Sequence, residues 1–106
     1  RVFFATNKSS LTTASRATLR KQATFLRKNK NLNITIEGHA DERGTREYNL
    51  ALGERRANAA RDYLMTYGIS GKRISVISYG KEKPVNPKSS PLAWSQNRRS
   101  VTVKVN

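Results

Sequence analysis

Four short stretches of the chain have the composition or the alternation of β-strands. Residues 1–6 are rich in Val and Phe and end at a polar run, and residues 32–37 alternate apolar and polar side chains up to Gly38. Residues 74–79 and 100–105 alternate in the same way. Alternation with a period of two is typical of a strand with one buried face. The pattern therefore predicts four strands.

Two longer stretches show the helical period. After several Ser and Thr residues suited to N-capping, Leu19, Ala23 and Leu26 recur at helical spacing in a segment that ends near residue 30. A second helix is expected over residues 47–67, and Gly68 stands where a left-handed C-terminal cap belongs. All three prolines follow residue 80 and precede residue 98, which predicts a long loop there.

The resulting order, β-α-β-α-β-β, predicts an α+β fold: a two-layer sandwich with both helices on one face of a mixed four-stranded sheet. The opposite face is expected to be wetter and to carry Thr35, Glu37, Thr102 and Lys104. A length of 106 residues corresponds to one domain, residues 1–106. Because the chain starts without Met and already within an expected strand, we interpret it as a domain cut from a longer precursor.

The charge is strongly positive but unevenly distributed. The 21 Lys and Arg against 7 Asp and Glu give a formal net charge of +14. Residues 1–36 carry 8 basic and no acidic side chains, residues 37–62 carry 5 basic and 6 acidic, and residues 63–106 carry 8 basic and 1 acidic. A basic chain suggests nucleic acid first. The concentration of acids in one quarter of the chain instead predicts specific chemistry there.

A helical wheel at about 100° per residue places Asn49, Leu52 and Arg56 on one face of the second helix, within its apolar stripe. An arginine on that face needs partners, because unpaired burial of a guanidinium is costly. One interpretation is a structural ion pair, or an alkyl stem over the core with its head in solvent. The other is an anion site near the start of the helix.

Asp41 lies in the loop that leads into this helix, beside Glu42 and before Gly44. An Asp near an Arg is first interpreted as a salt bridge. Alternatively, the pair holds a ligand with both an ammonium and a carboxylate, because a carboxylate accepts hydrogen bonds from ammonium and a guanidinium binds a carboxylate with two parallel bonds. The sequence leaves both interpretations open.

The remaining candidates for chemistry favour structural roles. The only histidine, His39, has no second histidine to share a metal, so we interpret it as a structural residue at a strand end. The chain has no Cys and its serines form no catalytic motif, so neither an enzyme nor a bound metal or cofactor is expected. Trp94 is expected to pack the long loop onto the domain. Strand alternation sends Arg98 and Arg99 to opposite faces, and one of them is expected near Asp41.

The segment from Ile36 to Asn58, IEGHADERGTREYNLALGERRAN, strongly resembles the OmpA-like C-terminal domain family and, within it, the peptidoglycan-associated lipoproteins (Pal). Further matches are Val2-Phe3-Phe4, the segment 77–84 and Asn97-Arg98-Arg99. They occur in the family's order and span essentially the whole chain.

This resemblance implies noncovalent binding of peptidoglycan through the meso-diaminopimelate of its stem peptide. In the family's pattern the Asp of the Gly-His-x-Asp loop, which matches Asp41, takes the ligand's ammonium. The Arg fifteen residues later, which matches Arg56, takes a carboxylate. Pal proteins often carry Asp where this chain has Asn7. The other residues expected at the site are Asn49, Leu52, Asn7, Thr6, Ala40 and Arg98.

The resemblance also implies a place in the cell. Pal proteins lie at the periplasmic face of the outer membrane and tether that membrane to the cell wall. Their lipid anchor would here lie outside the chain. Their partners include TolB and TolA of the Tol system. The surplus positive charge then becomes a solvated surface that assists approach to an anionic cell wall or lipid headgroups.

Two other functions fit the sequence less well. A basic nucleic-acid-binding domain predicts a steep loss of DNA affinity with salt, and it gives no role to the acidic segment, so no nucleic acid is expected. A peptidoglycan hydrolase would need paired carboxylates or a metal set within a cleft, whereas Asp41 and Glu42 are adjacent in sequence and are not expected to flank a bond.

Overall fold

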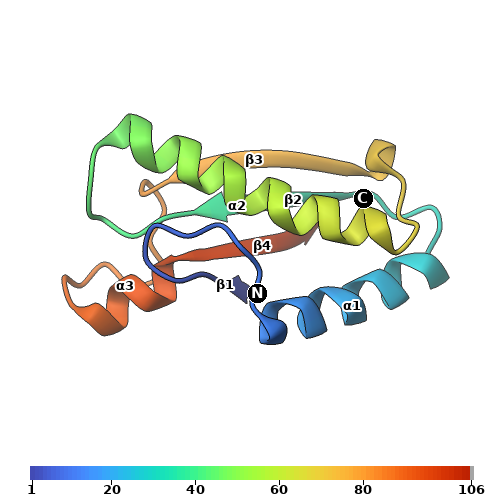
Figure 1. The fold of residues 1–106 in the computed structure, drawn as a ribbon. Helices are drawn as coiled ribbons and strands as arrows, with labels where there is room; N and C mark the ends of the chain where they lie inside the picture. Colours follow the sequence, from blue (N-terminus) through green and yellow to red (C-terminus); the bar gives the residue numbers. More distant parts are fainter. Residues whose placement is uncertain (106) are drawn as a thin grey trace.

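A computed structural model describes residues 1–105 of the chain and shows four strands and three α-helices (Figure 1). The elements in chain order are β1 (Val2–Phe3), α1 (Thr13–Lys28), β2 (Ile34–His39), α2 (Arg46–Thr66), the 3₁₀ helix η1 (Gly71–Arg73), β3 (Ile74–Gly80), α3 (Pro91–Asn97) and β4 (Arg99–Lys104). Thr12 caps α1 and Thr45 caps α2, each accepting a hydrogen bond from a backbone N–H three residues later.

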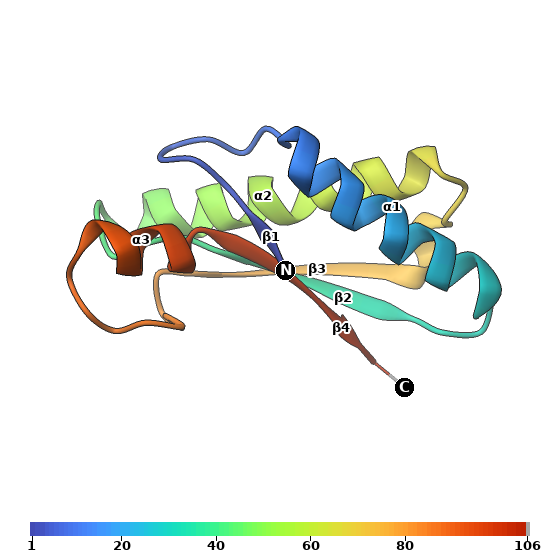
Figure 2. The ribbon, with the colours of Figure 1, turned by 90° about the horizontal axis from the view of Figure 1, so that it is seen from below.

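The strands form one mixed sheet in the order β1-β4-β2-β3. β2 and β3 are parallel and joined through α2, whereas β4 lies between β1 and β2 and is antiparallel to both. Figure 2 shows α1 and α2 in one layer above the sheet, with α3 beyond one end of it. The predicted α+β sandwich is confirmed.

The core lies between the sheet and the two long helices. Its buried apolar side chains come from β1 and the residue after it, from one face each of α1 and α2, and from the inward face of β2 and β3. Gly68 ends α2 with a φ of +87°, as expected of a left-handed cap. Among residues 1–105 no helix has both the length and the apolar character needed to cross a membrane.

The predicted long loop after β3 is wrong in one part, because residues 91–97 form α3. Ser90 caps this helix by accepting a hydrogen bond from the N–H of Ala93 at 3.1 Å, and Pro91 occupies its first turn. Proline is well suited to that position, because its fixed φ is helical and the N–H it lacks has no partner there. The prolines at 84 and 87 do lie in irregular chain, as expected.

The expected position of two β4 residues on the wetter face is also wrong. Thr102 pairs with Ile36 and Lys104 pairs with Ile34, and directly opposed residues in a sheet point to the same side. Both therefore face the helices: the Thr102 hydroxyl donates to Gln22 of α1 at 2.7 Å. The valines of β4 take the open face, because register and not side-chain polarity decides which side a residue faces.

Candidate functional site

Two loops and the start of one helix meet at one end of the sheet and enclose a cavity of about 250 Å³. They are the chain after β1, the loop between β2 and α2, and the first turns of α2, all at the left of Figure 1. The residues that line the cavity are Thr6, Asn7, Asp41, Arg43, Gly44, Tyr48, Asn49, Leu52 and Arg56. Six of the eight residues predicted for the site are among them.

Arg56 is fully buried, although it lines this cavity. Its guanidinium is held by three backbone carbonyls from two segments: Nε donates to Lys8 at 2.9 Å and Nη2 to Ala5 at 3.2 Å, both after β1, and Nη1 donates to His39 at 2.9 Å. These bonds use three of the five N–H groups of the guanidinium. They fix the charge at the junction of β2, α2 and the chain after β1.

In the described part of the chain, Arg56 is neither part of an ion pair nor a side chain whose guanidinium reaches solvent. Its head does not reach solvent, and within residues 1–105 no carboxylate forms an ion pair with it. Burial lowers the pKa of Arg56 to about 10, with the nearby Asp41 charge acting in the opposite direction. The group is therefore still protonated at neutral pH, which leaves a buried cation stabilised by carbonyl dipoles at the cavity.

Asp41 supplies the negative charge of the cavity, and it is buried to 7% exposure. Its carboxylate accepts hydrogen bonds from the backbone and side chain of Arg43 and from Nη1 of Arg98 at 3.3 Å. Burial acts to raise the pKa of Asp41, but the hydrogen bonds from Arg43 and Arg98 outweigh it and lower the pKa below its usual value. Asp41 is therefore ionised at neutral pH.

The polar residues around these two charges hold the loops that form the cavity. Nδ2 of the buried Asn49 donates to the carbonyls of Arg43 at 2.8 Å and Thr45 at 3.0 Å, which fastens the β2–α2 loop to α2. Asn7 adopts a φ of +57°, which Asn tolerates better than most residues, and its Oδ1 accepts from the hydroxyl of Tyr48 at 3.3 Å. These bonds fix the positions of the loops around the cavity.

Two of the predicted site residues do not line the cavity. Ala40 is buried, and its N–H donates to the carbonyl of Gly80 at 2.8 Å, which ties the end of β2 to the end of β3. Arg98 is the one of the two C-terminal arginines that reaches Asp41, and its Nε also donates to the carbonyl of Phe4 at 2.9 Å. Of these two residues, Arg98 is the one that contacts Asp41 directly.

The sequence interpretation missed three residues of the cavity: Arg43, Gly44 and Tyr48. Gly44 has a φ of +95°, so the loop needs a residue without a Cβ at that point. The N–H of Arg43 donates to Oδ1 of Asp41 at 3.0 Å, a turn that Asp characteristically forms with the residue two positions later. That preference is the signal in the sequence that could have identified Arg43.

The guanidinium of Arg43 also lies over the ring of Trp94, 4.2 Å from its centroid. Trp94 belongs to α3, so this contact joins α3 to the β2–α2 loop. The prediction that Trp94 packs its segment onto the rest of the structure is consistent with this contact, although the segment is a helix.

His39 occupies the strand end beside the site without lining the cavity. Its ring is buried and stacks on Tyr79 with centroids 5.5 Å apart, and Nε2 lies 3.4 Å from Oε1 of Glu37. Burial and the charge of Arg99 lower the pKa of His39 to about 4, although the carboxylate of Glu37 acts to raise it. Across residues 1–105 no three His, Cys, Asp or Glu side chains are grouped as metal ligands.

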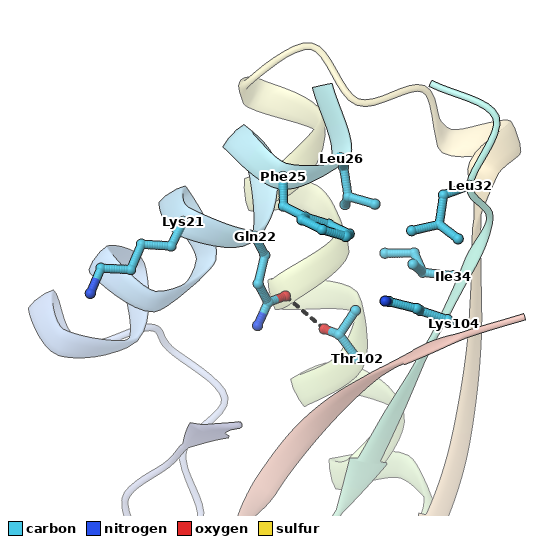
Figure 3. A pocket seen from close by; sticks show the side chains of 8 residues that line it. All are labelled: Lys21, Gln22, Phe25, Leu26, Leu32, Ile34, Thr102 and Lys104. Carbon is cyan, nitrogen blue, oxygen red and sulfur yellow. Dashed lines mark hydrogen bonds between the residues drawn. The ribbon is translucent and has the colours of Figure 1, made fainter. Parts of the chain in front are cut away.

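A second cavity, of about 330 Å³, lies between α1 and the other end of the sheet (Figure 3). Phe25 and Leu26 of α1 face Leu32 and Ile34 there, with Lys104 at the edge. Its walls are mostly apolar, and its charged residues, Lys21 and Lys104, are both cations, so among the described residues it offers no pair of opposite charges. The cavity between Asp41 and Arg56 is therefore the candidate binding site, and its two fixed charges suit a zwitterionic ligand.

Comparison with known proteins identifies relatives over nearly the whole chain. The profile of the OmpA family matches residues 3–98. A peptidoglycan-associated lipoprotein of Rhizobium meliloti is 60% identical over 103 residues, which are 97% of this chain and 58% of that protein. One of Pseudomonas putida is 43% identical over 97 residues, 92% of this chain and 58% of the relative. The chain spans about three fifths of the length of these relatives.

Solved structures show the same architecture. The crystal structure of the peptidoglycan-associated lipoprotein from Burkholderia pseudomallei superposes with a TM-score of 0.95 at 39% identity, covering 98% of this chain and 88% of that one. The C-terminal domain of Helicobacter pylori MotB gives a TM-score of 0.90 at 21% identity, covering 99% and 82%. The second likeness is one of fold alone.

Proposed function

This chain belongs to the OmpA family, and we propose that it binds peptidoglycan noncovalently, through the meso-diaminopimelate of the stem peptide. The free end of that residue carries an ammonium and a carboxylate on one carbon. Asp41 accepts hydrogen bonds from the ammonium, Arg56 binds the carboxylate, and Leu52 contacts the methylene chain. No covalent step is required, and the chain acts as a binding module and not as an enzyme.

The observation that carries this proposal is the buried charge of Arg56. A guanidinium with no ion-pair partner among residues 1–105 lines the same cavity as an ionised carboxylate. A buried cation held only by neutral carbonyls gains more from an anionic ligand than a solvated one does, because the low dielectric strengthens the attraction. The carboxylate of the ligand supplies the missing countercharge.

The matched relatives are named peptidoglycan-associated lipoproteins, which supports a role at the cell wall. We extend the proposal to the whole protein: a lipid anchor outside this chain holds it at the periplasmic face of the outer membrane. It tethers that membrane to the wall together with TolB and TolA of the Tol system. Binding at both ends gives a link whose strength depends on the reach of the connecting segment.

Neutralising Asp41 is the direct test. Asp41→Asn keeps the shape of the side chain but removes the charge that accepts the ammonium, so we expect binding of free meso-diaminopimelate to weaken at least about 10-fold. Calorimetric titration of the 106-residue chain measures this change. Co-sedimentation with purified peptidoglycan should show the same loss.

Asp62→Asn is the matched control, because it removes the same charge from an exposed position on α2 outside the cavity. It should bind like the parent chain. Nα-acetyl-L-lysine amide, whose free end has the ammonium but no carboxylate, should compete poorly. Equal binding by Asp41→Asn and the parent would reject the assigned site.

A further inference from the structure

The acceptor capacity of Asp41 is already full in this structure. Oδ1 accepts from the backbone N of Arg43 at 3.0 Å and from its Nε at 3.2 Å, and Oδ2 accepts from Nη2 of Arg43 at 2.9 Å and Nη1 of Arg98 at 3.3 Å. A carboxylate offers about four lone-pair directions. A ligand ammonium therefore has to replace one of the donors now present.

The side chain of Arg43 is the donor that is free to leave. It is 40% exposed, against 14% for Arg98, whose Nε is also fixed by the carbonyl of Phe4. The backbone N–H of Arg43 is part of the turn and cannot withdraw alone. The remaining side-chain contacts of Arg43 are a 3.3 Å bond to Thr6 Oγ1 and the cation–π contact with Trp94, both weak at an exposed position.

We propose that the Arg43 guanidinium occupies the ammonium position of the binding site in the free protein, and that the ligand displaces it. This inference rests on the proposed function, because it assigns the displaced group of the same site. Arg43 keeps the buried carboxylate paired when no ligand is bound, so Asp41 is not left as an uncompensated charge. The consequence is a lower affinity, because each binding event first breaks the Arg43–Asp41 pair.

Trp94 makes the displacement observable. It is the only tryptophan of the chain, and the Arg43 guanidinium lies over its ring. Withdrawal of a cation from an indole face changes the electrostatic environment of the fluorophore. Titration of the 106-residue chain with free meso-diaminopimelate should therefore shift Trp94 emission, with the same Kd that calorimetry gives.

Arg43→Ala should start with shifted emission, show no further change on titration, and bind meso-diaminopimelate about 2- to 5-fold more tightly, as expected from losing a competing exposed ion pair. Arg46→Ala is the matched control. It removes an arginine that pairs with Glu82 at 3.0 Å on the surface, and both readouts should match the parent.

The outcomes separate the two proposals. If meso-diaminopimelate gives heat but no emission change in the parent chain, Arg43 stays in place and the inference is overturned while the proposed function stands. Weaker binding by Arg43→Ala overturns it as well, because Arg43 then contacts the ligand. If neither chain gives heat, the proposed function fails and this inference fails with it.

Discussion

At the scale of single residues, the distinctive feature is a buried guanidinium held by carbonyl groups. Ala5 and Lys8 after β1 and His39 at the end of β2 each give one carbonyl to Arg56 of α2, so this side chain joins three segments that are far apart in sequence. Carbonyl dipoles satisfy its N–H groups but leave its net charge without an ion pair among residues 1–105. The same residue therefore stabilises the fold and prepares an anion site.

Arg56→Lys should destabilise the chain even though it keeps the charge. A compact ammonium cannot bond three carbonyls arranged around a planar fork, so we expect the free energy of unfolding to fall by about 2–4 kcal/mol. Urea denaturation measures this. Arg55→Lys, at the exposed neighbouring position, should change stability by less than about 0.5 kcal/mol. A similar small change for Arg56→Lys would contradict the structural role.

At the scale of elements, the site depends on how closely α2 lies against β2. Gly38 of β2 and Gly53 of α2 make this approach possible: a Cβ on Gly53 would lie 2.3 Å from Ser78 Oγ and 2.9 Å from the carbonyl oxygen of Gly38. The contact sits one helical turn from Arg56. It sets the distance between the loop that carries Asp41 and the helix that carries Arg56.

Gly53→Ala separates two opposing effects. Helix propensity alone predicts a gain of about 1 kcal/mol from replacing a helical glycine with alanine. The clash with β2 and β3 should reverse the sign and lower the free energy of unfolding by about 1–3 kcal/mol. Thermal unfolding measures the change. An increase in stability would show that α2 can move away from the sheet.

At the scale of the whole molecule, one histidine and no cysteine leave His39 as the only side chain whose ordinary pKa lies between 5 and 8. In the folded chain its pKa is lowered to about 4 by burial and by Arg99. As the pH falls, His39 of the unfolded chain becomes protonated near pH 6.5, whereas His39 of the folded chain becomes protonated only near pH 4. Stability therefore rises with pH across this interval and is lost as pH falls.

We expect the free energy of unfolding to be about 2 kcal/mol lower at pH 5 than at pH 8. Urea denaturation at a series of pH values, at constant ionic strength, measures the slope. His39→Gln removes the titrating group, so its stability should vary little between these two pH values even if its overall stability is lower. A parent chain with a flat profile would show that His39 protonates without loss of stability.

The local features of this protein can be predicted from periodicity and capping residues in its sequence. The order of strands and long helices, the cap at Gly68 and the common face of Asn49, Leu52 and Arg56 all follow from periodicity and capping within one segment. Asn49, Leu52 and Arg56 line one cavity because they lie on one helix face, and Asp41 lies in the loop that leads into that helix. Thr6 and Asn7 are expected there only from the family resemblance. The helix-face pattern needs no knowledge of distant partners.

Other features depend on contacts between segments that are far apart in sequence. The inward direction of Thr102 depends on strand register, and helix α3 in the proline-containing segment is held by contacts such as Arg43 with Trp94. Likewise, the sequence could not choose between an ion pair and an anion site for Arg56, since its partners are three carbonyls from two segments far from it in sequence. Backbone carbonyls are present at every residue, so their position in space, and not residue type, selects which of them meet a side chain.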